Sequence, residues 1–267
     1  MNFKEETNRR VDNRLKRSWI DVNTKLAHFS IISYQVPISR IEHLIPSPFK
    51  LWSFKENGIE YAIISAVPFK DKDFSFYRIS RFPSFNFFQT NFRTYVIDQR
   101  DGTNLAWFFA TTLGSITSVI PKRIWKMPWG YGKYSFDYQL EKSEYIQYRM
   151  EFTSKQGDGL VDIKSTGSEM KLLHGFDSLE QQIHILTHPV TGYYDSSKTE
   201  FGTYEIWHQK IDLTEGVANH LYFEIYEKLG FLTKEEMNHP HSVLICPEIE
   251  FDILLPPRKQ KKNSFNF

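Results

Sequence analysis

The stretch "NFRTYVIDQRDGTNLAWFFATTL", residues 91–113, decides the fold, because it holds two strand patterns and the turn between them. Residues 91–98 and 105–113 are rich in the β-branched and aromatic side chains that favour strands. Between them, Asp101-Gly102 is a strong signal for a tight β-hairpin. The stretch therefore predicts two antiparallel strands joined by a short turn.

Alternation along the first of these strands creates a polar face. Asn91, Arg93 and Tyr95 point to one side of the strand, because successive strand residues face opposite ways. If that side faces the interior, Arg93 is a buried cation that needs a partner. A substrate carboxylate could fill this role, since a guanidinium binds carboxylates through two hydrogen bonds. The alternative is a structural ion pair with a carboxylate such as Glu205 or Asp252.

Further strand patterns cover most of the remaining chain. The segment 59–69 is apolar and is expected to end at Pro68, and the segment 242–257 is a long strand that bends or lies at an edge at Pro247. Alternating apolar and polar residues predict four more strands. These lie at 131–141, 144–152, 159–166 and 203–213.

Two segments have the pattern of helices. Ser39 can cap a short helix that Pro46 then ends. The segment 215–229 shows helical spacing and closes at Gly230, which predicts a longer helix packed outside the strands. Its apolar stripe consists of Ala218, Leu221, Ile225 and Leu229.

Composition and continuity indicate one domain of the mainly β (α+β) class. Aromatic residues make up 16% of the chain, which suits β-sheet faces and an apolar core or cavity. Because no repeat or low-complexity linker interrupts residues 19–257, we expect a single domain there. Residues 1–18 are predicted to form a polar N-terminal arm, and residues 258–267 a basic, solvated tail.

Charge and cysteine content restrict the expected partners and compartment. The net charge of +1 gives no indication of nucleic-acid or membrane binding, so neither partner is expected. The single cysteine, Cys246, cannot form an internal disulfide, and the first residues lack the apolar core of a signal peptide. We therefore expect a cytoplasmic protein. A homo-oligomer is compatible with the sequence.

Four stretches together have the character of a known family. They are "FSIISYQVPISRIEHLIPSPFKLWSFKENGIEYAIISAVPFK" (29–70), "FPSFNFFQTNFRTYV" (82–96), "AWFFATTLGSITSVIPKRIWKMPWGYGKY" (106–134) and "LLPPRK" (254–259). With them, about residues 19–257 resemble the DUF2071, or YqjF-like, family of the acetoacetate-decarboxylase-like superfamily, and Asn-Phe-Arg-Thr-Tyr is the most specific part of the resemblance. It implies a closed antiparallel β-barrel with a few peripheral helices and a central ligand cavity.

The same resemblance raises a question about the reaction. In acetoacetate decarboxylase, the turn that matches "MPWGYGK" carries a lysine pair, whose first lysine forms a Schiff base. Here Trp129 and Gly130 follow Pro128 instead. Lys133 lies four residues beyond Trp129, roughly 13 Å along a strand, and Lys126 is the other nearby amine. The decarboxylase mechanism is therefore not expected.

Aromatic residues and one histidine complete the candidate site. Trp129, Tyr131 and Tyr134 either line the mouth of a cavity or pack at the end of the barrel. His208 shares a strand face with Tyr204, which leaves it either in the core or facing the lumen.

Metal and cofactor chemistry has little support in the sequence. His184 and His188 have metal-ligand spacing only in a helix, and Pro189 with the preceding apolar residues favours a strand end. A phosphate loop, a nucleophile elbow and a paired-cysteine motif are all missing from the sequence, so we expect no cofactor and no metal.

The sequence thus predicts a barrel that binds a small organic ligand such as a carboxylate. Arg93 would orient the ligand, Asn91 and Tyr95 would hydrogen-bond it, and Trp129 with Tyr131 would cover it. The first alternative is an enzyme that acts on a keto acid without an imine, using His208 or a carboxylate to carry a proton. The second is a non-catalytic barrel that contacts other proteins through exposed aromatic residues.

Overall fold

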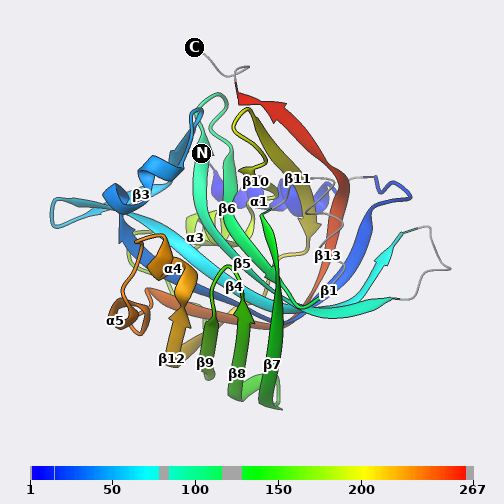
Figure 1. Ribbon diagram of the computed structural model, residues 1–267, viewed down its shortest axis with the longest axis vertical. Helices are drawn as coiled ribbons and strands as arrows, with labels where there is room; N and C mark the ends of the chain where they lie inside the picture. Colours follow the sequence, from blue (N-terminus) through cyan, green and yellow to red (C-terminus); the bar gives the residue numbers. More distant parts are fainter. Residues whose placement is uncertain (1, 15, 78–83, 116–127, 263–267) are drawn as a thin grey trace.

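The computed structural model describes residues 2–14, 16–77, 84–115 and 128–262, and most of these residues lie in strands (Figure 1). Thirteen strands of the described residues belong to one sheet. The first six are β1 (Val22–Pro37), β2 (Phe49–Leu51), β3 (Ser53–Glu56), β4 (Ile59–Phe76), β5 (Phe85–Asp98) and β6 (Asn104–Leu113). The others are β7 (Trp129–Glu141), β8 (Glu144–Ser154), β9 (Gly159–Glu169), β10 (Thr191–Asp195), β11 (Glu200–His208), β12 (Thr214–Phe223) and β13 (Ser242–Lys261).

Helices are short and lie beside the sheet. The α-helices among the described residues are α1 (Phe3–Asp12), α3 (Leu179–Thr187), α4 (Glu224–Lys228) and α5 (Lys234–Met237). Two 3₁₀ turns, η1 (Ile38–Arg40) and η2 (Glu42–Leu44), follow β1. In Figure 1, α4 and α5 lie together beside the end of β12, and α1 packs against α3 on another side of the sheet.

Strand pairing returns on itself at two places. The order β11-β10-β6-β7-β8-β9-β12-β13-β1-β4-β5-β2 is extended by pairings of β11 with β13 and of β6 with β5. The expected mainly β class is confirmed. Most neighbours are antiparallel, but β6 pairs in parallel with both β10 and β7, which the sequence pattern did not predict.

The hairpin over residues 91–113 forms as predicted. Ile97 pairs with Asn104 next to the turn, and the antiparallel register continues to Gln89 and Leu113. The two faces of β5 enter different cores, because Phe92 packs with the aromatic cluster around Trp107 and Tyr226. Tyr95, on the opposite face, packs into a second core beneath α3.

Pro68 of β4 and Pro247 of β13 lie where the pairing of each strand with β1 is interrupted. Pro68 does not end β4, which continues to Phe76. It falls in the irregular stretch between Ala66 and Lys70, where pairing with β1 is interrupted, so its missing N–H breaks no β1–β4 bond. Pro247 lies opposite His28, whose φ of 54° marks a kink in β1, and these two residues are left out of the β1–β13 pairing.

Both predicted helices need correction. Residues 214–223 form β12, which pairs with β9, and only residues 224–228 are helical as α4. The apolar spacing was misleading because register shifts at Thr214–Gly216 and Ala218–His220 break the simple alternation of this strand. Around Ser39 the chain forms the two 3₁₀ turns, and Ser39 caps neither of them.

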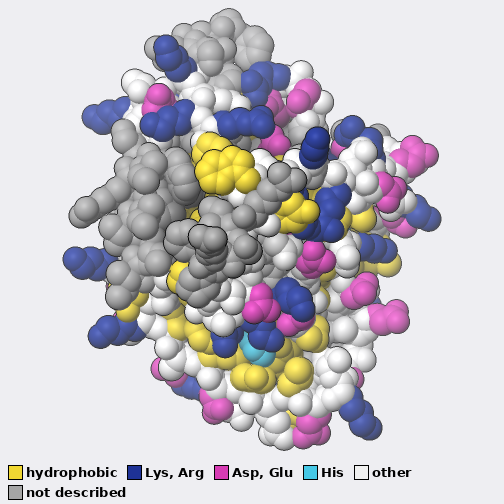
Figure 2. All heavy atoms as spheres, turned by 90° about the vertical axis from the view of Figure 1, so that its right-hand side faces the viewer, with side chains coloured by type: hydrophobic (Ala, Val, Ile, Leu, Met, Phe, Trp, Pro, Cys, Tyr) yellow, Lys and Arg dark blue, Asp and Glu magenta, His cyan; other side chains and the backbone are white. Residues whose placement is uncertain are grey.

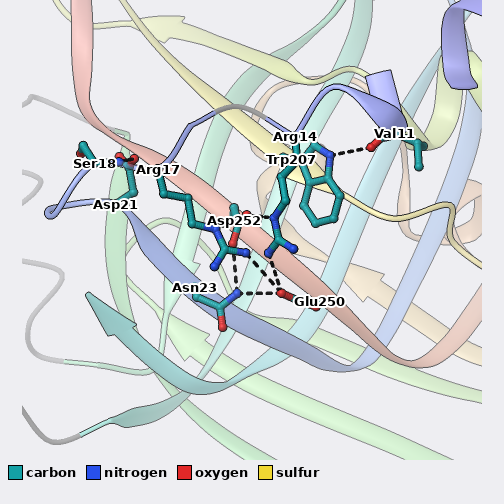
Figure 3. A network of polar contacts seen from close by, with 9 residues as sticks. All are labelled: Val11, Arg14, Arg17, Ser18, Asp21, Asn23, Trp207, Glu250 and Asp252. Atoms are coloured by element: carbon teal, nitrogen blue, oxygen red, sulfur yellow. Dashed lines mark hydrogen bonds and ion pairs between the residues drawn. The ribbon is translucent and has the colours of Figure 1, made fainter. Parts of the chain in front are cut away.

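The N-terminal segment attaches to the outside of the sheet through a charged network (Figure 3). Arg14 and Arg17 donate from Nε to Oδ2 of Asp252 at 2.9 and 2.8 Å, and Asp252 is almost fully buried. The Trp207 indole donates to the Val11 carbonyl at 2.9 Å, and the Arg14 guanidinium lies over its ring. Together these contacts hold the end of α1 and the segment after it against β11 and β13.

Surface charges are mixed in sign. Figure 2 shows basic and acidic side chains interspersed over the described atoms of one face. The first residues of the predicted basic tail belong to β13, where Arg258 pairs with Glu205 at 3.4 Å and Lys259 with Glu200 at 3.7 Å. The sheet therefore continues to Lys261 on that side.

Candidate functional site

A cavity of about 70 Å³ lies against the face of β5 that carries Asn91 and Arg93. It is enclosed mostly by apolar side chains from β1, β4, β11 and β13, with a few polar groups among them. The lining residues are Leu26, Phe29, Val67, Phe69, Asp71, Gln89, Asn91, Arg93, Phe108, Thr187, Pro189, Gly192, Tyr204, Ile206, Ile211, Phe251 and Ile253. An apolar enclosure with few polar groups is typical of small-molecule sites.

Strand alternation explains which residues reach the cavity. On β4, Val67, Phe69 and Asp71 are two residues apart and share one face, and Gln89, Asn91 and Arg93 do the same on β5. On β11 and β13 the opposite faces carry Trp207 and Asp252, which hold the N-terminal segment. The same strands therefore line the cavity on one side and bind that segment on the other.

Arg93 is a buried cation without an anionic partner among the described residues. Its side chain is 8% exposed, and its only hydrogen bond to a described residue runs from Nη2 to the Leu186 carbonyl at 3.0 Å. Its Nε is buried without a hydrogen-bond partner. The expected alternative of an ion pair with Glu205 or Asp252 is wrong, because these carboxylates pair with other arginines on the outside.

Asn91 orients its amide by accepting two hydrogen bonds. Its Oδ1 accepts from Thr111 Oγ1 at 2.9 Å and from Gln89 Nε2 at 2.8 Å. No described residue accepts a hydrogen bond from its Nδ2, so two N–H donors of Asn91 remain for a molecule in the cavity.

Asp71 is a cavity residue that the sequence analysis missed. It is 2% exposed, and its Oδ1 accepts a hydrogen bond from Thr24 Oγ1 at 3.0 Å. Burial raises the pKa of Asp71 to about 7, and the Thr24 hydrogen bond opposes this rise. A signal was present, because Asp71 continues the alternation of Val67 and Phe69 and so had to share their buried face.

Three other predicted site residues, Tyr95, Trp129 and Tyr131, do not line the cavity. Tyr95 is buried beyond Arg93, and its hydroxyl is 2.9 Å from Ser65 Oγ. Trp129 is half-buried and packs against the cluster of Ala106, Phe108 and Tyr194, whereas Tyr131 is 44% exposed on β7. Their proposed role in ligand binding stays a prediction.

His208 lies close to the cavity wall without lining it. Its Nδ1 is 2.6 Å from the Gln209 carbonyl, and its ring is stacked on Phe251. The His188 ring lies 4.6 Å away between centroids. Burial lowers the pKa of His208 to about 4 and that of His188 to about 2, so both are neutral at pH 7.

The His184 segment is helical, contrary to the strand end expected from Pro189. His184 lies in α3 with its Nδ1 3.0 Å from Thr7 Oγ1 of α1. Among the described residues no group of three or more histidine, cysteine, aspartate or glutamate side chains could hold a metal ion. The contact between His184 and Thr7 therefore supports the packing of α1 on α3.

Lysine is not among the residues that line the cavity in the described part of the chain. Lys133 is exposed on β7, where it pairs with Thr153 of β8. Lys126 lies outside the described residues. Gly130 is buried against Gln156, whose Oε1 would lie 2.2 Å from a Cβ at position 130.

Solved structures with a similar fold define the class of protein. Acetoacetate decarboxylase from Legionella pneumophila matches with a TM-score of 0.59 and 10% identity, over 90% of this chain and 86% of that one. The enduracididine biosynthesis enzyme MppR complexed with pyruvate matches with a TM-score of 0.58 and 9% identity, over 95% of this chain and 93% of that one. An acetoacetate decarboxylase-like enzyme from Sphingomonas wittichii RW1 matches with a TM-score of 0.54 and 9% identity, over 93% of this chain and 98% of that one. The chain therefore has an acetoacetate-decarboxylase-like fold.

The family follows from the sequence match. Residues 23–250 match the DUF2071 family, described as an uncharacterized conserved protein. This chain belongs to the DUF2071 family, as its sequence motifs predicted. No curated protein matches the sequence. Among the described helices, none combines the length and the apolar character that crossing a membrane requires.

Proposed function

We propose that this protein binds a small organic carboxylate in the cavity, with Arg93 as the anchor. The observation that carries the proposal is a buried guanidinium that lines a cavity and has no carboxylate partner among the described residues. A buried cation left unpaired is costly, and an anionic ligand removes that cost by forming charge-assisted hydrogen bonds.

The neighbouring groups support the same ligand. Asn91 presents free N–H donors toward the cavity, and Phe108 and Val67 provide an apolar wall. MppR, which has a similar fold, was solved with pyruvate, itself a small carboxylate. We further propose that the strand pairings close into a barrel around this cavity, with Trp129 and Tyr131 near its rim and Tyr95 and His208 behind its wall.

An enzyme that avoids an imine is the second candidate function. Asp71 favours it, because a cavity carboxyl with a pKa of about 7 can both give and take a proton near neutral pH. The residues that line the cavity supply no lysine for a Schiff base. Proton transfer on a bound keto acid is the reaction class that this arrangement supports.

Calorimetric titration at pH 7 tests the binding proposal. We expect at least one of pyruvate, acetoacetate and hexanoate to bind, and the corresponding amide to bind at least tenfold more weakly. Arg93→Met should weaken carboxylate binding at least tenfold, because it removes the cation and retains an apolar side chain of similar length. Arg149→Met is the matched control, since Arg149 is an exposed arginine on β8 that pairs with Glu151 and Asp162.

Three results bear on the proposal. Binding that is equal in wild type and Arg93→Met would refute Arg93 as the anchor. Equal binding of carboxylates and amides would refute a carboxylate ligand. Failure of all three acids to bind would count against a small-carboxylate site.

A further inference from the structure

The cavity has ionisable groups of opposite sign at its two ends. Arg93 pairs across the β4–β5 ladder with Ser65, and Asp71 pairs with Phe87. Asp71 lies six positions after Ser65 on β4, which corresponds to about 20 Å of extended backbone. The two side chains share one strand face and one cavity, but they lie far from each other along it.

The wall between these ends is mostly apolar, with Gln89 and Asn91 of β5 as polar members, and the space is small. Val67 and Phe69 lie between the two levels on β4, and Leu26 and Phe29 face the cavity from β1. The volume of about 70 Å³ is small. A space of this volume that extends from Arg93 to Asp71 admits an unbranched chain better than a branched or cyclic molecule.

Asp71 has unused capacity to accept hydrogen bonds. A carboxylate can accept about four hydrogen bonds, and among described residues Asp71 receives one side-chain hydrogen bond, from Thr24 to Oδ1. Its Oδ2 receives none from a described residue, and Asp71 forms no ion pair with one. A molecule in the cavity can therefore donate to Asp71.

Nearby cations are engaged elsewhere. Lys72, the chain neighbour of Asp71, pairs with Glu248 at 3.1 Å, and Lys25 of β1 pairs with the same glutamate at 3.4 Å. Lys70 extends over the ring of Phe88 on β5. These lysines are one position from Asp71 or Thr24 along their strands, so they point to the opposite face of the sheet.

We infer that the ligand of this cavity is a slender zwitterion, an unbranched ω-amino carboxylate whose carboxylate binds Arg93 and whose ammonium binds Asp71. The inference rests on the proposed carboxylate site and adds a second recognition group at its far end. Charge complementarity selects this class, because a buried carboxyl is best satisfied by a cation that also donates hydrogen bonds. A methyl-ended acid of the same length would leave Asp71 without a partner.

Paired ligands test the inference by calorimetry at pH 7.5. The probes are 4-aminobutanoate, 6-aminohexanoate and 8-aminooctanoate. Each is compared with the acid of equal length in which a methyl group replaces the ammonium, namely pentanoate, heptanoate or nonanoate. We expect at least one amino acid to bind tenfold or more tightly than its methyl-ended counterpart. Asp71→Asn should reduce that advantage to less than about twofold. Asp73→Asn is the control, because Asp73 is an exposed carboxyl on the same strand.

Proton release gives an independent measurement. Burial places the pKa of Asp71 at about 7, so a fraction of the free protein carries a proton there at pH 7. An ammonium ligand favours the ionised form, and its binding should release about half a proton per site at pH 7 and almost none at pH 9. Titrations in two buffers of different ionisation enthalpy report this number, and Asp71→Asn should release no proton.

The possible failures can be told apart. If methyl-ended acids bind through Arg93 but the amino group adds no affinity, the inference is overturned and the proposed function stands. If the amino advantage survives in Asp71→Asn, Asp71 is not the ammonium site and the inference is overturned. If neither series binds, the proposed carboxylate site fails as well.

Discussion

Replacing Asp71 by asparagine should stabilise the protein, and the gain should grow as the pH rises. Asparagine has nearly the same shape and can still accept the Thr24 hydrogen bond, but it has no charge to bury. In the unfolded chain Asp71 titrates near 3.8, whereas burial raises its pKa in the folded protein to about 7. The folded state therefore keeps a proton that the unfolded state has already lost between these two values.

The sign of the effect follows from this order of pKa values. Below pH 3.8 both states are protonated, and Asp71 costs no ionisation energy. Between about pH 4 and pH 7 the unfolded state is favoured by ionisation, so the wild type loses stability as the pH rises. Above pH 7 both states are ionised, and the loss stays constant.

The size follows from the same two values. The rise from 3.8 to about 7 is roughly three pKa units, and each unit is worth about 1.4 kcal/mol, so the full loss is about 4 kcal/mol. At pH 5 the pH is about 1.2 units above the unfolded value of 3.8, so the loss in the free energy of unfolding is about 1.6 kcal/mol. The increase in the free energy of unfolding that Asp71→Asn gives over the wild type should therefore be about 2 to 3 kcal/mol larger at pH 8 than at pH 5.

Urea unfolding at pH 5 and pH 8 measures the difference. Wild type, Asp71→Asn and Asp73→Asn are compared at each pH without ligand. Taking the difference between the two pH values removes any effect of the substitution that does not depend on pH. Asp73 is exposed, so its variant should follow the wild type at both values. A gain for Asp71→Asn that is equal at pH 5 and pH 8 would refute the assignment of Asp71 as a buried titrating carboxyl.

Two further predictions concern the N-terminal network and the chemistry of the turn. Asp252→Asn should lower the free energy of unfolding by about 1–3 kcal/mol, because Arg14 and Arg17 lose a charged acceptor. A change below about 0.5 kcal/mol in urea titrations would contradict this prediction. Borohydride treatment in the presence of acetoacetate should leave the intact mass of the protein unchanged, because lysine is missing from the described cavity wall. A stoichiometric adduct on Lys126 or Lys133 that is lost in the alanine variant of that residue would restore an imine mechanism.

Local sequence patterns were sufficient where a strand keeps a regular alternation and a clear turn. The hairpin over 91–113 and the strands from β7 to β9 formed as expected, since alternation and turn residues act over a few positions. The same local information failed at 215–229, where register shifts in β12 imitate helical spacing. It also placed Pro68 at a strand end, because the sequence does not show which edge of β4 lacks a partner.

The candidate site divides in the same way. The sequence by itself placed Asn91 and Arg93 on one face of a strand, and it identified the family. Only the tertiary structure decided that Arg93 has no carboxylate partner among the described residues and that Asp71 shares its cavity. The reason is physical: alternation fixes which face a side chain occupies, but its charged neighbours come from strands far away in the sequence. Those neighbours, and the burial that raises the pKa of Asp71, exist only once the strands have paired.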